Sequence, residues 1–172
     1  MISDTMQAAL NDQINAELYS SYLYLSMAAY YQDSDLPGFA NWMRMQTLEE
    51  GVHATMFFDF LIERGGRVLL QPIAGPPTAW DSPLAPFEQA YEHETVVTRR
   101  INDLVTLALE ERDHATVTFL DWFVREQVEE EASALAIVKQ LRMIGDDRGG
   151  LFMLDRELAA RVFTPPAANA AG

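Results

Sequence analysis

Residues 48–54 read LEEGVHA and residues 126–131 read EQVEEE, and both stretches place carboxylates inside segments whose apolar residues recur every three or four positions. That spacing is typical of an amphipathic helix with one side turned toward a core. In the first stretch, Glu50 and His53 are three residues apart and share the side of the helix that also carries Phe57. Carboxylates on the apolar side of a helix need an explanation, and they decide how the rest of the chain is interpreted.

Each of the four long helical segments carries a carboxylate in its apolar stripe, and the spacing of these residues repeats. Glu17 precedes Glu50 by 33 residues, and Glu94 precedes Gln127 by the same number. The interval from Glu17 to Glu94 is 77 residues, as is the interval from Glu50 to Gln127. The chain is therefore expected to form two similar helical hairpins, whose pairing in one bundle brings six side chains to the same level: Glu17, Glu50, His53, Glu94, Gln127 and Glu130.

The pattern around these residues predicts an all-α fold. Glycine and proline signals divide the chain into four long helices and a shorter fifth, at about residues 3–32, 38–64, 84–111, 115–144 and 151–162. Residues 67–83 contain four prolines, cannot be helical in their middle, and are long enough to run the length of a helix. We therefore expect a four-helix bundle with one long crossover and a short C-terminal helix, forming a single domain over residues 1–163 with a flexible tail over residues 164–172.

Composition narrows the class of protein. The 172 residues suffice for one domain, and 49% of them are hydrophobic, so the chain is not disordered. The absence of cysteine excludes disulfide frameworks, thiolate zinc sites, iron–sulfur clusters and thiol nucleophiles. A net charge of −14 repels phosphate backbones and argues against a nucleic-acid partner. Apolar residues outside the bundle stripes, such as residues 68–70 of the crossover, indicate subunit contacts and hence an oligomer.

The sequence does not indicate a membrane protein. The longest uncharged stretch in the N-terminal half, residues 18–32, is too short and too polar to cross a bilayer. The first residues lack the basic and apolar regions of a secretory signal, so we expect a cytoplasmic protein.

Four carboxylates in a core require compensation, because each ionised group costs several kcal/mol in a medium of low dielectric constant. No lysine or arginine occupies the matching inward positions of the helices. The carboxyls must therefore either hold protons or bind cations, and four carboxylates offset the charge of two divalent ions. His53 adds a neutral nitrogen ligand beside Glu50, and oxygen ligands with one imidazole suit iron or manganese better than zinc or copper.

These motifs resemble those of a known family. Residues 48–54, the ERGG of residues 63–66, and residues 126–131 are similar to the second- and fourth-helix motifs of the bacterial non-haem ferritins, and the resemblance covers essentially the full chain. It implies an iron-storage ferroxidase that oxidises Fe(II) to Fe(III) with dioxygen or hydrogen peroxide and stores ferric oxyhydroxide inside a homo-oligomeric cage of 24 subunits. Haem-binding relatives place a methionine after the bridging glutamate, whereas this chain has Gly51, so no haem is expected.

The resemblance also implies which residues form a di-iron ferroxidase centre within each subunit. The first iron would be bound by Glu17, Glu50 and His53. The second would be bound by Glu94 and Glu130, with Glu50 bridging the two ions. All five direct ligands are present in this chain.

Further residues match positions around that centre. Gln127 would support the ligands of the second iron without binding it, and Tyr24 lies on the same helical side as Glu17 and could form a hydrogen bond or donate an electron. A third iron position nearer the cavity of the cage would use Glu49, Glu126 and Glu129.

Two other functions fit the same fold. One is a different di-iron carboxylate enzyme, such as an oxygenase or a peroxide reductase, which would need an organic-substrate pocket or an electron-donating partner. The other is a storage subunit without oxidase activity, which would be expected to lack some ligands. The sequence also leaves open the physiological oxidant, the route by which iron enters, the role of the third iron position, the electron donor for iron release, and whether other subunits join the cage.

Overall fold

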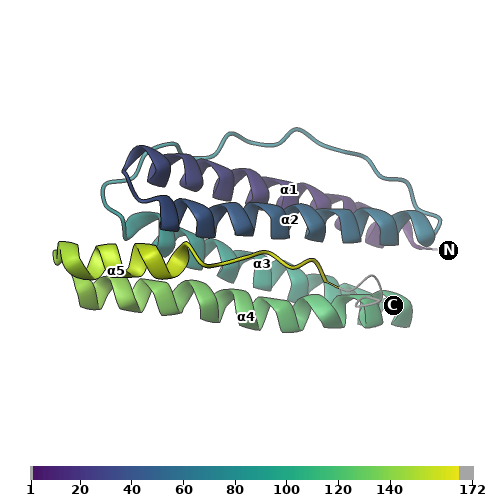
Figure 1. Ribbon diagram of the computed structural model, residues 1–172. Helices are drawn as coiled ribbons and strands as arrows, with labels where there is room; N and C mark the ends of the chain where they lie inside the picture. The colour runs from purple at the N-terminus through teal and green to yellow at the C-terminus, as the bar shows by residue number, and fades with distance from the viewer. Residues whose placement is uncertain (1, 167–172) are drawn as a thin grey trace.

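The structure is a computed structural model that describes residues 2–166, so residues 167–172 of the expected tail lie outside the described part. Its helices are α1 (Asp4–Asp33), α2 (Pro37–Glu63), α3 (Ala85–Glu110), α4 (His114–Ile144) and α5 (Arg148–Leu158). Between residues 2 and 166 there is no strand, which confirms the all-α prediction. Figure 1 shows α1 beside α2 and α3 beside α4, in the predicted four-helix bundle with one long crossover.

The four long helices begin and end within one residue of the expected positions because local signals define their ends. The side chain of Ser3 accepts a hydrogen bond from the backbone N–H of Met6 at 3.0 Å and caps the start of α1. Asp113 caps α4 in the same way through Thr116. After α2 the chain turns at Gly65, whose φ of 76° lies in the left-handed region that glycine adopts at little cost.

The crossover between α2 and α3 runs along the outside of α1 (Figure 1). Asn11 Nδ2 donates to the carbonyl oxygen of Arg67 at 3.0 Å, near the start of the crossover. At its other end, Tyr31 Oη donates to the carbonyl oxygen of Pro83 at 2.6 Å. Because these contacts follow α1 from its first turns to its last, the crossover spans the bundle and α3 begins where α1 ends.

The fifth helix differs from the prediction at both ends. It covers Arg148–Leu158 rather than residues 151–162. The side chain of Asp147 accepts hydrogen bonds from the N–H groups of Gly149 and Gly150, at 3.1 and 3.0 Å, so two glycines assigned to a loop belong to the first helical turn. Residues 159–166, which follow α5, have no regular structure and run back along the bundle between α2 and α4 (Figure 1).

The start of α2 is joined tightly to α5. Asp155 Oδ1 accepts hydrogen bonds from the backbone N–H groups of Gly38 and Phe39, at 2.7 and 3.1 Å, and thereby caps α2 from another helix. A Cβ atom on Gly38 would lie 1.7 Å from the carbonyl oxygen of Asp155. Only glycine permits this approach, so this contact fixes where α5 lies on the bundle.

The core consists of two apolar clusters separated by a polar layer. One cluster includes Tyr31, Phe39 and Phe87, and the other includes Leu10 and Phe57. In the sequence of every long helix, buried polar residues separate the members of one cluster from those of the other: Glu17 and Ser20 on α1, Gln46, Glu50 and His53 on α2, Glu94 on α3, and Gln127 and Glu130 on α4.

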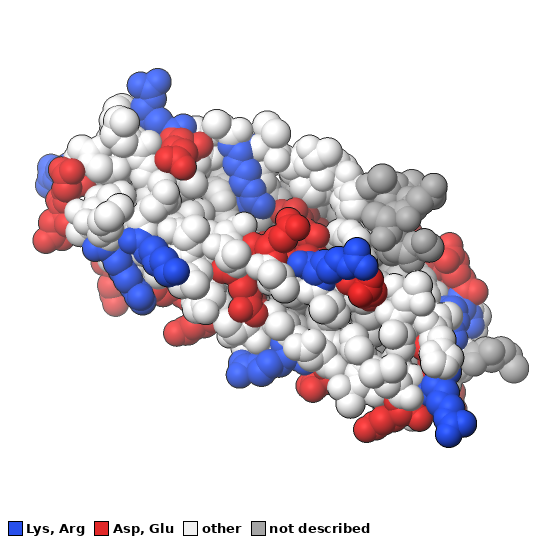
Figure 2. All heavy atoms as spheres, turned by 90° about the horizontal axis from the view of Figure 1, so that it is seen from below, with Lys and Arg blue, Asp and Glu red and all other residues white. Residues whose placement is uncertain are grey.

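The outside of the bundle carries charge of both signs. Figure 2 shows one face, on which carboxylates form several small groups with basic side chains between them. The net charge of −14 therefore does not mark a single acidic patch on this face. No helix in the described part of the chain combines the length and the apolar character needed to cross a membrane.

Candidate metal centre

The buried glutamate of α1 meets the glutamate and histidine of α2 in the polar layer. Glu17, Glu50 and His53, here called the inner group, each offer a ligand atom, and these atoms all lie within 4.8 Å of one another. Their exposed fractions are 1%, 2% and 3%. Because Glu50 and His53 are one helical turn apart, their side chains approach, and 3.1 Å separates His53 Nδ1 from Glu50 Oε2.

Within residues 2–166, no lysine or arginine forms an ion pair with the inner group. Burial raises the pKa of Glu17 to about 7, and burial with repulsion from neighbouring carboxylates raises the pKa of Glu50 well above its usual range. Glu17 Oε2 is buried without a hydrogen-bond partner, as expected for an atom that binds an ion. A cation here would satisfy that oxygen and favour both ionised carboxylates.

The surroundings of His53 keep its ring neutral and oriented. Burial lowers the pKa of His53 to about 4, so at neutral pH the imidazole retains a lone pair for a metal. The rings of Trp122 and Phe123 on α4 lie edge-on to it, with centroids 5.4 and 5.7 Å away. These rings exclude water from one side of the ligand and restrict its rotation.

The carboxylates of α3 and α4 are also buried, and neighbouring side chains donate hydrogen bonds to them. Glu94 accepts hydrogen bonds from Tyr24 Oη and from Gln127 Nε2, the latter at 3.1 Å. Glu130 accepts one from Gln46 Nε2 at 2.8 Å. Burial raises the pKa of both carboxyls, and repulsion from Glu94 adds to the rise at Glu130. Tyr24 and Gln127 therefore contact a predicted ligand, as the sequence suggests, although their roles stay predictions.

A second set of carboxylates adjoins the first. Glu49, Glu126 and Glu130, here called the outer group, have ligand atoms within 4.8 Å of one another. Burial raises the pKa of Glu126 to about 7, with repulsion from Glu49 and Glu129 adding to the rise. The expected third iron position combined Glu49 and Glu126 with Glu129. Glu129 is exposed and lies outside the outer group, whereas Glu130, about 100° further round α4, takes part.

Glu17 is oriented by two residues that sequence reasoning did not single out. Arg100 Nε donates to Gln13 Oε1 at 3.1 Å, and Gln13 Nε2 donates to Glu17 Oε1 at 2.7 Å. Because a guanidinium only donates hydrogen bonds, it turns the amide oxygen of Gln13 toward itself and leaves the amide NH₂ facing the carboxylate. A signal for Gln13 existed, since it precedes Glu17 by four residues on the same helical side.

The same arrangement recurs at Glu130. Arg161 donates to Gln46 Oε1, and Gln46 Nε2 donates to Glu130. Arg161 also pairs with Glu49, with 2.7 Å between Nη2 and Oε2. The helical pattern placed Arg161 near the end of the predicted fifth helix and did not predict these contacts. In the structure it lies beyond Leu158 and reaches the carboxylates only through the path of the chain after α5.

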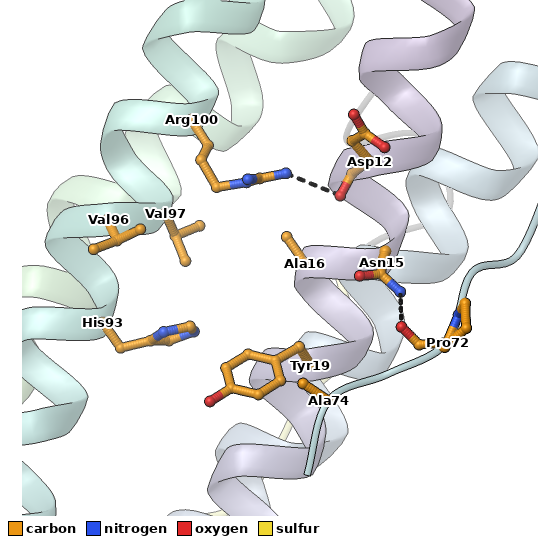
Figure 3. A pocket seen from close by; sticks show the side chains of 10 residues that line it. All are labelled: Asp12, Asn15, Ala16, Tyr19, Pro72, Ala74, His93, Val96, Val97 and Arg100. Carbon is orange, nitrogen blue, oxygen red and sulfur yellow. Dashed lines mark hydrogen bonds between the residues drawn. The ribbon is translucent and has the colours of Figure 1, made fainter. Parts of the chain in front are cut away.

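A pocket of about 390 Å³ lies between α1, α3 and the crossover, outside the carboxylate groups (Figure 3). Arg100 reaches across it and donates to the carbonyl oxygen of Asp12 at 2.9 Å. The rings of His93 and Tyr19 form part of its wall, and His93 Nε2 lies 2.7 Å from Ser20 Oγ. No member of the inner group lines this pocket, so His93 does not join the carboxylate centre despite its position next to Glu94 in the sequence.

Together, the two groups offer an oxygen-rich environment with one imidazole. Such a donor set suits hard divalent and trivalent ions such as iron or manganese. The described residues present no cysteine ligand, and the sequence contains none. The two groups adjoin each other, because Glu130 belongs to the outer group and repulsion from its carboxylate contributes to the raised pKa of Glu50 in the inner group.

Comparison with known proteins gives consistent results. A family model of the ferritin-like domain matches residues 7–144. A protein of Bacteroides fragilis named bacterial non-heme ferritin is 46% identical over 161 residues, which cover 94% of this chain and 100% of the relative. A protein of the same name from Staphylococcus saprophyticus is 40% identical over 163 residues, with 95% and 98% covered.

Solved structures agree with the sequence matches. A crystal structure of a novel open-pore ferritin from the hyperthermophilic archaeon Archaeoglobus fulgidus is 59% identical and has a TM-score of 0.94. The match covers 94% of this chain and 100% of that chain. A closed form of the Archaeoglobus fulgidus ferritin engineered by site-directed mutagenesis has the same identity and TM-score, with 95% and 100% covered.

Proposed function

Because this chain belongs to the ferritins, we propose that it stores iron, oxidising Fe(II) at a di-iron centre within each bundle and holding the ferric oxyhydroxide product inside a cage of 24 copies. The observation that carries the proposal is the inner group. It combines two buried carboxylates, a neutral imidazole and a buried oxygen without a hydrogen-bond partner. Iron is here the substrate, and dioxygen or hydrogen peroxide is the oxidant.

Glu17, Glu50 and His53 are proposed to bind the first Fe(II), and Glu94 and Glu130 the second. Mutual repulsion is strong among the carboxylates, since neighbouring glutamates raise the pKa of Glu50 and of Glu130 in addition to the effect of burial. Two divalent ions between them would offset four negative charges. Glu50 is proposed to bridge the ions, because repulsion from both Glu94 and Glu17 acts on it.

The protein side of the reaction consists of holding ligands and releasing protons. Tyr24 and Gln127 donate hydrogen bonds to Glu94 and so limit its movement when an ion arrives. Carboxyls that hold protons in the metal-free protein lose them when iron binds, so binding releases protons. Hard carboxylate oxygens favour Fe(III) over Fe(II), which promotes electron loss to the oxidant.

The outer group is proposed to receive oxidised iron on its way to the cavity of the cage. It shares Glu130 with the second iron position, so an ion can pass between the two groups without leaving carboxylate oxygens. Of the predicted residues, Glu49 and Glu126 are members of this group, whereas exposed Glu129 contributes charge nearby.

Assembly into a cage is proposed from apolar side chains that one bundle leaves uncovered. On α1 and the crossover, several large hydrophobic residues are 41–67% exposed: Tyr22, Leu25, Leu69, Leu70 and Ile73. Large apolar side chains exposed in this number are typical of surfaces that contact other subunits. A particle of 24 chains of 19.4 kDa in solution would support the proposal, whereas a monomer or dimer would favour another di-iron enzyme.

The direct test is stopped-flow absorbance after metal-free protein is mixed aerobically with two Fe(II) per chain. Wild-type protein should oxidise iron much faster than buffer alone, and Glu17→Ala or His53→Ala should remove the fast phase while the cage still assembles. Glu92→Ala removes an exposed carboxylate of α3 and is the matched control, which should keep the wild-type rate. Equal initial rates in all four proteins would refute the assignment of the centre, and oxidation no faster than in buffer would favour storage without oxidase activity.

A further inference from the structure

The segment after α5 is fastened along α2. Residues 159–166, here called the strap, follow the last helix without regular structure. Asn41 Nδ2 on α2 donates to three carbonyl oxygens where α5 ends and this segment begins, those of Leu158 at 3.2 Å, Ala159 at 3.4 Å and Arg161 at 2.9 Å. One side chain therefore fixes the backbone of the strap at the point from which Arg161 extends.

The guanidinium of Arg161 is held on several sides. It lies over the ring of Trp42 at 4.4 Å from the centroid and donates to the carbonyl oxygen of Trp42 at 3.3 Å. It also donates to Gln46 Oε1 and, at 2.7 Å, to Glu49 Oε2. The side chains of Arg161 and Glu49 are only 25% and 20% exposed, so this pair is more constrained than an ordinary surface salt bridge.

The position of this cation matters because Glu49 belongs to the outer group. A metal ion bound by Glu49, Glu126 and Glu130 would use a carboxylate that Arg161 already neutralises. A metal ion and the Arg161 guanidinium would repel each other if both contacted the single carboxylate of Glu49. Arg161 and a third metal ion therefore compete for the same ligand.

We propose that Arg161 is a built-in counter-ion of the outer group, and that the strap must withdraw its guanidinium from Glu49 before a third metal ion binds there. The inference rests on the proposed function in one respect, namely that the ion in question is iron. The strap and Arg161 would thus control when the outer group can bind a metal ion.

The contacts of Gln46 connect this step to the second iron position. Gln46 receives a hydrogen bond from Arg161 through its amide oxygen and gives one to Glu130 through its amide nitrogen. Departure of Arg161 removes the interaction that orients this amide, which loosens the hydrogen bond that holds Glu130 and lets this carboxylate bind an ion together with Glu49 and Glu126. Opening of the strap and transfer of an ion from the second position are therefore expected to occur together.

The test is a calorimetric titration of the metal-free, assembled protein with Zn²⁺, which binds to carboxylates and imidazole without being oxidised. Arg161→Gln should raise the affinity of the third ion per chain about tenfold or more, the effect of losing one competing charge-assisted hydrogen bond. The affinity of the first ion should be unchanged, because Arg161 forms no hydrogen bond with Glu17, Glu50 or His53. Arg156→Gln is the matched control, because it removes the same charge from an exposed residue of α5 and should leave the third affinity at the wild-type value.

A second variant separates the strap from the charge. Asn41→Ala leaves Arg161 intact but removes the hydrogen bonds that hold the strap, so it should raise the third affinity in the same direction by a smaller factor. If Arg161→Gln does not assemble, the affinity of Asn41→Ala for the third Zn²⁺ alone tests the proposal. A third affinity that is unchanged or weaker in the decisive variant overturns the proposal. Failure of the first two ions to bind to wild-type protein would instead count against the di-iron centre.

Discussion

The inner and outer groups differ in how the negative charge of their carboxylates is balanced. In the inner group, carboxylates with at most 2% of their surface exposed form no ion pair with a lysine or arginine of the described chain, and Glu17 Oε2 has no hydrogen-bond partner. In the outer group, half-buried Glu49 is paired with Arg161. The inner group therefore depends on protons or metal ions for its charge balance, whereas the outer group already has a cation from its own chain.

This difference implies an order of filling. A metal ion entering the inner group displaces only protons, while an ion entering the outer group must also displace an arginine held by several contacts. The inner group should thus fill first, and the outer group should receive ions only when the inner group has loaded. The following predictions test that contrast, beginning with the largest expected effect.

The largest effect is expected at Glu50, the carboxylate proposed to bridge the two iron positions. Glu50→Gln keeps the shape of the side chain but removes the charge between the two ions. Fast Fe(II) oxidation should fall on the order of 100-fold or more, because a directly coordinating ligand is lost. Stopped-flow absorbance measures this change. Glu63→Gln, an exposed substitution on the same helix, should leave the rate unaltered.

The next effect is the pH dependence of the stability of the metal-free protein. Unfolded carboxyls have pKa values near about 4.3, and unfolded histidines, with a pKa near about 6.5, are half protonated at pH 6.5. Burial lowers the pKa of His53 and of His93 to about 4, so these two rings act against the carboxyls, but the raised pKa values of four glutamates outweigh them: Glu17, Glu50, Glu126 and Glu130. Folded Glu17, with a pKa of about 7, still holds its proton at pH 6.5 and loses it as the pH rises toward 8. The folded state binds more protons than the unfolded state in this window, so raised carboxyl pKa values stabilise it at the lower pH, and this stability is lost as the pH rises.

Differential scanning calorimetry should therefore show a lower Tm at pH 8 than at pH 6.5 for the metal-free protein, by a few degrees. Zn²⁺ should abolish or reverse that difference, because the ion replaces the protons and binds better to ionised carboxylates. Glu17→Gln cannot titrate at this position and should show a smaller decrease. A Tm that increases with pH in the metal-free protein would contradict the charge balance inferred for the inner group.

A moderate effect is expected from the residues that orient Glu17. Arg100→Gln removes the guanidinium that turns the Gln13 amide toward the carboxylate, and should weaken binding of the first Zn²⁺ roughly tenfold, as for other partners of metal ligands. Arg99→Gln changes the charge equally at an exposed neighbour and should have little effect. Equal affinities in the two variants would mean that Gln13 keeps its orientation without Arg100.

The smallest effect separates two neighbouring glutamates of α4. Glu129→Gln should change the affinity of the third ion by less than about threefold, because it removes an exposed and screened charge outside the outer group. Glu126→Gln removes a ligand of that group and should weaken the third ion more strongly. The same calorimetric titration measures both variants, and the reverse ranking would support the predicted role of Glu129 in the third iron position.

Local sequence signals predicted most of the fold and of the inner group. Caps and glycines defined the four long helices to within one residue, and the spacing of Glu50 and His53 placed both on the buried side of α2. The fifth helix was less accurately predicted, because the side chain of Asp147 draws Gly149 and Gly150 into its first turn against their low helical propensity.

The sequence by itself thus determined the helices and the buried carboxylate stripes, because these follow from spacings of three and four residues along single helices. The 33-residue repeat also predicted that Glu17 lies level with Glu50 and His53 of the next helix, and the three residues do meet. Only the tertiary structure decided that Glu130 rather than Glu129 joins Glu49 and Glu126, and that Arg161 covers the outer group. Those contacts join residues more than 75 positions apart, and Arg161 reaches Glu49 because Asp155 anchors α5 on α2. Such contacts depend on how helices pack and where a chain turns, which no local periodicity encodes.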